Sequence, residues 1–324
     1  MRVEQNFPQK VIAFLKKSPA IMAALISIVL FGFTAIMVPT ALNIGAISTI
    51  FMMTVLLSIA SAGQTFVLIG GGLDFTVGSV MSTAALITTT IMNSQDGLVL
   101  PSLIAVLLVG AIVGFINGIC TVKIGLPALV VTMAISNVLT QVTFAFLGGN
   151  QGRFAGPAFI QSVVYRFFGV IPSITLYALV FFPLVFYILY RSRFGRQLYL
   201  VGNNPMAAKL VGINVNRVKI LSYVISGMFS GFAGMLGAAI FQTARNRMFD
   251  EYAYESLIAV IVGGTSFAGG IGTYTGSISG SLLMVVLNNM LTTLNLSQPM
   301  RNIALGTVMV ILLVMYNRRK SVRQ

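Results

Sequence analysis

The chain has 324 residues, of which 57% are hydrophobic and only 8% are charged. A soluble domain has no use for so much apolar side chain with so few charges to hydrate it, so the composition excludes soluble classes and indicates an integral protein of the lipid bilayer. The net charge of +14 does not indicate nucleic-acid binding, because the basic residues flank apolar runs and do not alternate with aromatic residues in a patch.

The apolar runs predict transmembrane α-helices. Lipid offers no partner to backbone N–H and C=O groups, so runs of about 20 residues without alternation select helices over a barrel. We expect an all-α, polytopic membrane protein with about ten transmembrane helices in one domain, residues 1–324. The third and eighth predicted spans are short, which leaves nine or eleven spans as alternatives. In chain order the predicted spans are residues 20–38, 46–70, 78–93, 98–121, 127–147, 172–190, 219–243, 255–270, 273–294 and 302–316.

The distribution of basic residues predicts the orientation, because Lys and Arg near span ends stay in the cytoplasm. Residues 1–19 precede a run too long for a signal peptide, so the first span is expected to be uncleaved. With ten spans and a cytoplasmic N-terminus, fifteen of the 20 basic residues lie inside and five outside. Both termini and the loop 191–219 are then cytoplasmic. Four acidic residues fall outside: Asp96, Asp250, Glu251 and Glu255.

The loop 191–219 contains the pattern of a short helix. Asn204 can cap it, Pro205 suits its first position, and Gly212 can end it in a left-handed conformation. About two turns are too short to be stable alone in water, so we expect the helix to dock on a soluble motor protein. The alternative is a loop that only orients the chain. The predicted coupling residues are Asn204, Pro205, Met206, Ala207, Ala208, Leu210, Val211 and Gly212.

No chemistry of its own is predicted for the chain. The phosphate-binding pattern G-x-x-x-x-G-K-[ST] does not occur, and there is no His and only one Cys, Cys120, so neither an intramolecular disulfide nor a catalytic, cofactor or metal site is expected. Any energy for its function must come from another chain or from an ion gradient.

Two glycine-rich stretches, "GGGLDFTVGSV" (Gly70–Val80) and "VGGTSFAGGIGTYTG" (Val262–Gly276), predict either close helix packing or irregular backbone that lines a cavity. In the first, Gly71, Gly72 and Gly78 surround Asp74. Two roles are open for Asp74. It could be an ion site, or it could have a structural role, in which it accepts hydrogen bonds from backbone N–H groups of the turn or caps the next span. We favour the structural role, because no second acidic residue is expected within the spans.

Polar amides within the predicted spans line a hydrophilic path or join helices by hydrogen bonds, and the sequence does not separate these roles. They are Gln64, Asn117, Asn137, Gln141, Asn288 and Asn289. The chain has no Trp, which removes a large stacking surface for sugar rings, so solute selection is expected to occur elsewhere.

Four stretches carry a resemblance to a known family: "GQTFVLIGGGLDFTVGSVM", "GLPALVVTMAISNVL", "RSRFGRQLYLVGNNPMAAKLVGINVNRVKILSYVISGMFSGFAGML" and "AVIVGGTSFAGGIGTYTGSISGSLLMVVLNNML". In this order they resemble the permease subunits of bacterial ATP-binding-cassette (ABC) importers of the ribose and simple-sugar group, from about Ser61 to Tyr316. Phe75 and Thr76 stand where the family more often has Leu and Ser, and 246–255 matches weakly.

The resemblance implies a permease subunit in the bacterial inner membrane, without enzymatic activity. It further implies two ATPase subunits, a second permease copy or paralogue, and a periplasmic binding protein that delivers a sugar or sugar-like solute. The region 202–214 would be the coupling helix that docks on the ATPase. Two alternatives are a secondary transporter driven by ions, with Asp74 as its ion site, and the amino-acid branch of the same importer superfamily.

Overall fold

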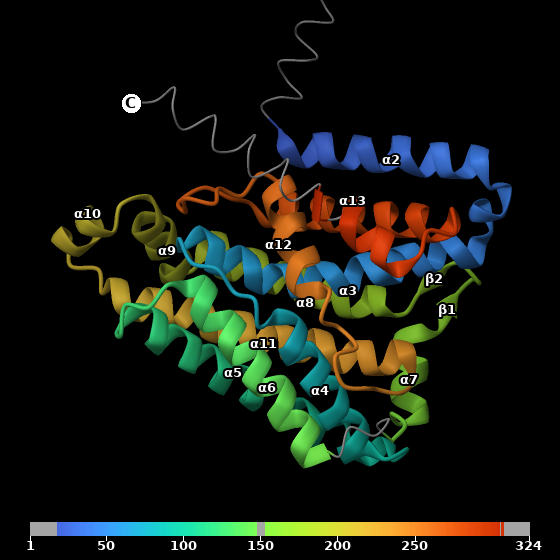
Figure 1. Cartoon of the computed structure of the whole chain (residues 1–324), viewed down its shortest axis with the longest axis horizontal. Helices are drawn as coiled ribbons and strands as arrows, with labels where there is room; N and C mark the ends of the chain where they lie inside the picture. Colours follow the sequence, from blue (N-terminus) through green and yellow to red (C-terminus); the bar gives the residue numbers. More distant parts are fainter. Residues whose placement is uncertain (1–17, 148–152, 305, 308–324) are drawn as a thin grey trace, which may run out of the picture.

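The computed structural model describes residues 18–147, 153–304 and 306–307. Within them the fold is helical apart from one antiparallel pair of two-residue strands, β1 (Arg166–Phe167) and β2 (Ile171–Pro172), in which Arg166 lies opposite Pro172. The expectation of an all-α polytopic protein is therefore confirmed. The main helices of the described residues differ in length and direction (Figure 1). They are α2 (Pro19–Met37), α3 (Ile44–Ile69), α4 (Val77–Met92), α5 (Val99–Val122), α6 (Ala128–Leu147), α8 (Ile174–Phe186), α11 (Val215–Phe241), α12 (Tyr252–Val262) and α13 (Tyr274–Thr293).

Shorter elements connect these helices. Two 3-10 turns, η1 (Pro39–Leu42) and η2 (Asp96–Leu98), precede α3 and α5, and a π-helical turn, η3 (Tyr187–Arg191), extends α8. There are three further helices: α7 (Pro157–Val164), α9 (Arg193–Asn203) and α10 (Pro205–Leu210). Figure 1 places α9 and α10 at one end of the molecule and α7 with the β-strands at the other.

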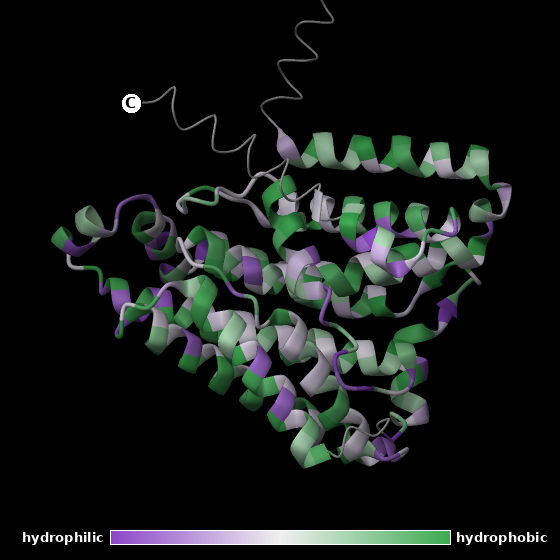
Figure 2. Ribbon diagram, viewed as in Figure 1, coloured by the Kyte–Doolittle hydropathy of each residue, from purple (hydrophilic) through white to green (hydrophobic). Residues whose placement is uncertain are grey.

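Six segments of the described chain are long and apolar enough to cross a membrane, which makes this a multi-pass membrane protein. Five of them are α2, α3, α6, α11 and α5 with η2, and the sixth is α8 with η3. Most residues of α2 are hydrophobic (Figure 2), and Ile28, Val29 and Ile36 on it are exposed. The predicted count of ten stays a prediction, and most of the predicted span 302–316 lies outside the described residues.

Two helices, α4 and α12, are shorter than the hydrocarbon core of a bilayer is thick. At 1.5 Å per residue, the 16 residues of α4 rise about 24 Å and the 11 of α12 about 16 Å, against a hydrocarbon core of about 30 Å. The prediction of a span over 255–270 is wrong for its second half, because α12 ends at Val262 and a glycine-rich loop follows. Gly263 caps α12, and Gly264 has a φ of +95°, which stops the helix.

Irregular backbone leads into each short helix, and the two starts lie together inside the molecule. Residues 70–76 precede α4 and 242–251 precede α12. The backbone N–H of Phe249 donates to the Ser82 hydroxyl at 2.9 Å, and the rings of Phe75 and Tyr254 meet edge to face at 5.6 Å. Nonhelical backbone at membrane depth is tolerated only where protein buries it or water reaches it.

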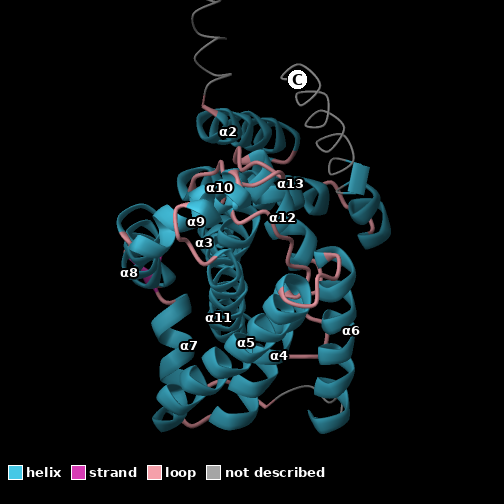
Figure 3. Cartoon of the chain, turned by 90° about the vertical axis from the view of Figure 1, so that its left-hand side faces the viewer, coloured by secondary structure: helices cyan, strands magenta, loops and turns pink. Residues whose placement is uncertain are grey.

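Helix α11 forms the centre of the fold, packed against α3, α4 and α5. Figure 3 shows α11 between α3 and α5, seen from the end where α9 and α10 lie. The contact with α5 is close because glycines lie on both sides of it: a Cβ on Gly110 or Gly114 would collide with the backbone of Gly227 or Tyr223. Small residues stabilise membrane helix pairs by this close approach.

Candidate functional site

The basic loop of the sequence folds as two short helices, α9 and α10. The side chain of Asn204 caps α10 by accepting a hydrogen bond from the Ala207 N–H at 3.0 Å, and Gly212 adopts a φ of +80°. The predicted short helix, its cap and its left-handed glycine are thus confirmed, while α9 was not predicted. Ser192 caps α9 by accepting a hydrogen bond from the Gly195 N–H at 3.0 Å. In the sequence, the arginines on both sides of Ser192 obscured this capping residue.

Helix α10 presents large apolar side chains to its surroundings. Met206 is 69% exposed, Leu210 82% and Val211 73%, and Ala207 is also exposed. We call these four residues the α10 face. Ala208 differs from the other predicted coupling residues, because it is buried against this chain at 3% exposure. The side chains of the α10 face are therefore accessible to a partner, whereas that of Ala208 is not.

The two glycine-rich stretches meet beneath α9. The N–H of Gly270 donates to the Ile69 carbonyl at 2.8 Å, and a Cβ on Gly202, the penultimate residue of α9, would collide with the same carbonyl. Gly269 lies against the backbone of Gly71, and both have positive φ, +85° and +76°. We call this contact of Gly71, Gly202, Gly269 and Gly270 the glycine junction. It joins the end of α3 and the loop after α12 to the base of the α9–α10 pair.

Asp74 lies at the centre of a hydrogen-bond network and is only 1% exposed. One carboxylate oxygen accepts from the Thr76 N–H at 2.9 Å and from the Thr76 hydroxyl at 2.5 Å. The other oxygen accepts from the Ser226 hydroxyl of α11 at 2.8 Å. Asn117 of α5 donates to the Thr76 hydroxyl oxygen at 2.9 Å, so the network joins α5, α11 and the segment before α4.

This geometry favours the structural interpretation of Asp74. Its carboxylate satisfies a backbone N–H of irregular chain that lipid would leave unpaired, that of Thr76, one residue before α4 begins. Next to it, Tyr223 of α11 both donates to the Leu73 carbonyl and accepts from the Leu73 N–H, each at 3.3 Å. Leu73 and Asp74 are thereby tied to α11, and Thr76 to α5. Gly72 and Gly78 permit the fit, because a Cβ there would meet Tyr223 or the backbone of Phe249.

A second acidic residue is buried, which corrects the sequence argument. Glu255 was placed outside the spans, but it lies in the first turn of α12 at 6% exposure and accepts a hydrogen bond from Asn288 of α13. Asp74 is therefore not the one acidic residue buried among the described helices, which weakens the argument that was based on its isolation. Glu255 lies just before the apolar run Leu257–Val262, at the end of a predicted span. Its position there did not indicate that its side chain is buried.

The predicted amides do not form one group. Asn117 belongs to the Asp74 network and Asn288 to Glu255, while Asn289 is half-buried on α13. Gln64 of α3 is fully buried, and its side-chain amide has no hydrogen-bond partner among the described residues. Asn137 and Gln141 are exposed on α6, one helical turn apart. Asn117 and Asn288 therefore join helices by hydrogen bonds, whereas Asn137 and Gln141 form an exposed polar surface on α6.

Apolar spans, interrupted helices in the interior and a small helix pair outside the spans define a polytopic membrane permease. The chain belongs to the family described as the permease component of branched-chain amino acid transport systems, whose model matches residues 46–313. The expectation of a transport subunit without enzymatic activity is confirmed by this membership.

Relatives extend over nearly the whole chain. The ribose import permease RbsC of Escherichia coli K12 is 27% identical over 95% of this chain and 96% of its own length. The galactose/methyl galactoside import permease MglC of Haemophilus influenzae is 30% identical over 88% of this chain and 90% of its own. RbsC of Bacillus subtilis is 29% identical over 80% of each. These relatives confirm the resemblance to the ribose and simple-sugar importers. No significant match among solved structures was found.

Proposed function

We propose that this chain is the membrane-spanning permease subunit of an ABC importer that moves a sugar or sugar-like solute across the bacterial inner membrane. A periplasmic binding protein delivers the solute, ATPase subunits in the cytoplasm supply the energy, and a second permease copy or paralogue completes the path. The names of the relatives, which are import permeases for ribose and for galactose or methyl galactoside, support a sugar over an amino acid.

The α10 face is the single observation that supports this proposal most strongly. Leu210 and Val211 expose apolar side chains at the end of α10, outside the six membrane-crossing segments, and the proposed orientation puts them in the cytoplasm. A helix of six residues has no stability of its own, so its apolar residues serve a protein contact. The glycine junction lies beneath α10 and connects it to the ends of α3 and α12. The irregular segment that follows α3, residues 70–76, leads from there into the interior.

The second permease is proposed to face α6. Exposed amides within a span are costly in lipid, and Asn137 has only the Met133 carbonyl as a described partner, at 3.1 Å. An amide both donates and accepts, so Asn137 and Gln141 suit a symmetric contact or a hydrated path between two permeases. Solute then passes along α6 and not through the core of one chain.

The experiment that tests this function is transport by purified components. The permease is reconstituted in vesicles with a candidate ABC ATPase and a candidate solute-binding protein, and uptake of labelled ribose, galactose and leucine is compared. ATP-dependent uptake of a sugar supports the proposal. Uptake of leucine alone assigns the chain to the amino-acid branch, as the wording of the family description allows.

A further inference from the structure

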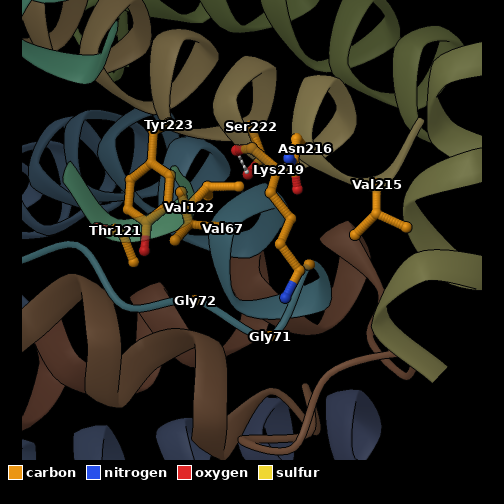
Figure 4. Close-up of a pocket in the computed structure, with 11 residues that line it drawn as sticks. Val67, Gly71, Gly72, Thr121, Val122, Val215, Asn216, Lys219, Ser222 and Tyr223 are labelled. Atoms are coloured by element: carbon orange, nitrogen blue, oxygen red, sulfur yellow. Dashed lines mark hydrogen bonds between the residues drawn. The ribbon is translucent and has the colours of Figure 1, made fainter. Parts of the chain in front are cut away.

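A polar cavity of about 190 Å³ opens between the ends of α3 and α5 and the first turns of α11 (Figure 4). It holds roughly six waters at about 30 Å³ each. The backbone of Gly70–Gly72 forms one wall, and Thr121, Asn216, Lys219 and Tyr223 supply polar groups from the other sides. Neither the Asp74 network nor the α10 face uses this space.

Lys219 enters the cavity as a positive charge without a counter-ion. Its side chain is half-buried and extends toward the Gly71–Gly72 backbone (Figure 4). In the described part of the chain the one ion pair joins Arg247 and Asp250, and no hydrogen bond from the Lys219 ammonium is present. Asp74 does not line the cavity, and both of its carboxylate oxygens are occupied by Thr76 and Ser226. Removing an ammonium from water without a partner is costly, so an anion would stabilise it.

The depth of Lys219 matches the lipid headgroups. The 27 residues of α11 rise about 40 Å, some 10 Å more than the hydrocarbon core, and Lys219 is its fifth residue. Exposed Lys123 lies at the adjoining end of α5 and adds positive potential. A neutral sugar would leave the ammonium uncompensated, whereas a phosphate offers both negative charge and several acceptor oxygens.

We propose that this cavity binds a phosphate group, with Lys219 as its cationic anchor. The phosphate belongs to the headgroup of an anionic lipid in the leaflet on the α9–α10 side, or it is free inorganic phosphate. The Asn216 amide also lines the cavity and can donate to it, whereas the Thr121 hydroxyl donates to the Asn117 carbonyl at 2.7 Å and can only accept. A bound phosphate would bridge α5, α11 and the glycine-rich segment next to the glycine junction.

Ligand-induced thermal stabilisation of the purified full-length permease in neutral detergent tests this site. Two probes are titrated separately at constant ionic strength: phosphatidylglycerol, with phosphatidylcholine as the zwitterionic reference, and inorganic phosphate, with chloride as the reference. We expect one probe to stabilise the parent protein. Lys219→Gln should weaken its apparent affinity roughly tenfold, as loss of a charge-assisted hydrogen bond predicts.

The matched control is Arg217→Gln, which removes the same charge from the same helix outside the cavity, and it should change the affinity by less than about twofold. Lys219→Arg keeps the charge and should retain binding, which separates anion binding from a folding defect. A response to phosphatidylglycerol alone assigns the lipid, and a response to inorganic phosphate assigns the free ion. Equal responses of the parent, Lys219→Gln and Arg217→Gln, or no response of the parent to either probe, would overturn the proposal.

Discussion

At the residue scale, Asp74 shows how a charged group serves irregular backbone inside a membrane protein. It accepts three hydrogen bonds from Thr76 and Ser226 and leaves no carboxylate oxygen without a partner. We expect Asp74→Asn to keep much of the transport, because an amide oxygen still accepts from Thr76 and the Ser226 hydroxyl can turn to accept from the amide. Uptake assays on purified, folded protein check this.

The matched variant Asp74→Ala removes every acceptor and leaves the Thr76 N–H unpaired, at a cost of about 1–3 kcal/mol for each orphaned group. It should lower both thermal stability and transport. Loss of transport in a stable, correctly assembled Asp74→Asn protein would contradict the structural role and point to a step that requires the charge.

Glu255 gives the ion-coupled alternative a second candidate, so it requires its own test. Its carboxylate accepts from Asn288, and a glutamine at this position keeps an acceptor oxygen without the charge. We expect Glu255→Gln to transport at a rate close to that of the parent. Coupling to protons predicts the opposite: abolished uptake in Glu255→Gln, with normal insertion and ATPase binding.

Sequence patterns predict residue contacts only when the partners are near in the chain. The cap of α10 by Asn204 spans three residues and was predicted, whereas Asp74 and Ser226 are 152 residues apart and Asn288 and Glu255 are 33 apart. Helix phase and composition contain no information on which distant faces meet. The buried position of Ala208 was missed for the same reason, since it depends on the surrounding fold.

At the element scale, helix positions follow from apolar runs and their ends follow from glycine and capping residues. The predicted spans 20–38, 127–147 and 273–294 agree within one residue with α2, α6 and α13. Helix α9 was missed because its apolar side chains cover one face and arginines the other, so no apolar run appears. Helix α7 was also missed, and the two-residue β-strands are too short to give a pattern.

Helix α10 carries the sharpest prediction at this scale. Leu210→Glu places a charge on the α10 face, where docking would require its desolvation, so it should weaken ATPase association roughly 30-fold or more. Leu200→Glu is the matched control, because Leu200 is 52% exposed on the neighbouring α9 and lies outside the α10 face. Co-purification and binding assays with the ATPase measure the difference. Equal binding by both variants would show that α10 is not the contact.

For the whole molecule, the orientation is tested by labelling from outside. Asp96 accepts from the Ala158 N–H of α7 at 2.8 Å, so its neighbour Gln95 lies at the end of the molecule opposite α10. In a Cys120→Ser background, Gln95→Cys should react with an impermeant thiol reagent in intact cells, and Asn204→Cys should react only after the membrane is opened. Labelling of position 204 in intact cells would reverse the proposed topology.

The most direct test of the proposed function is the energy source of uptake. In vesicles containing the permease, its ATPase and its binding protein, labelled sugar uptake should require ATP and the binding protein, and it should continue when protonophores collapse the pH gradient. Leu210→Glu should abolish this uptake, and Leu200→Glu should not. Sugar uptake by the permease alone, driven by an imposed ion gradient without ATP, would contradict the account.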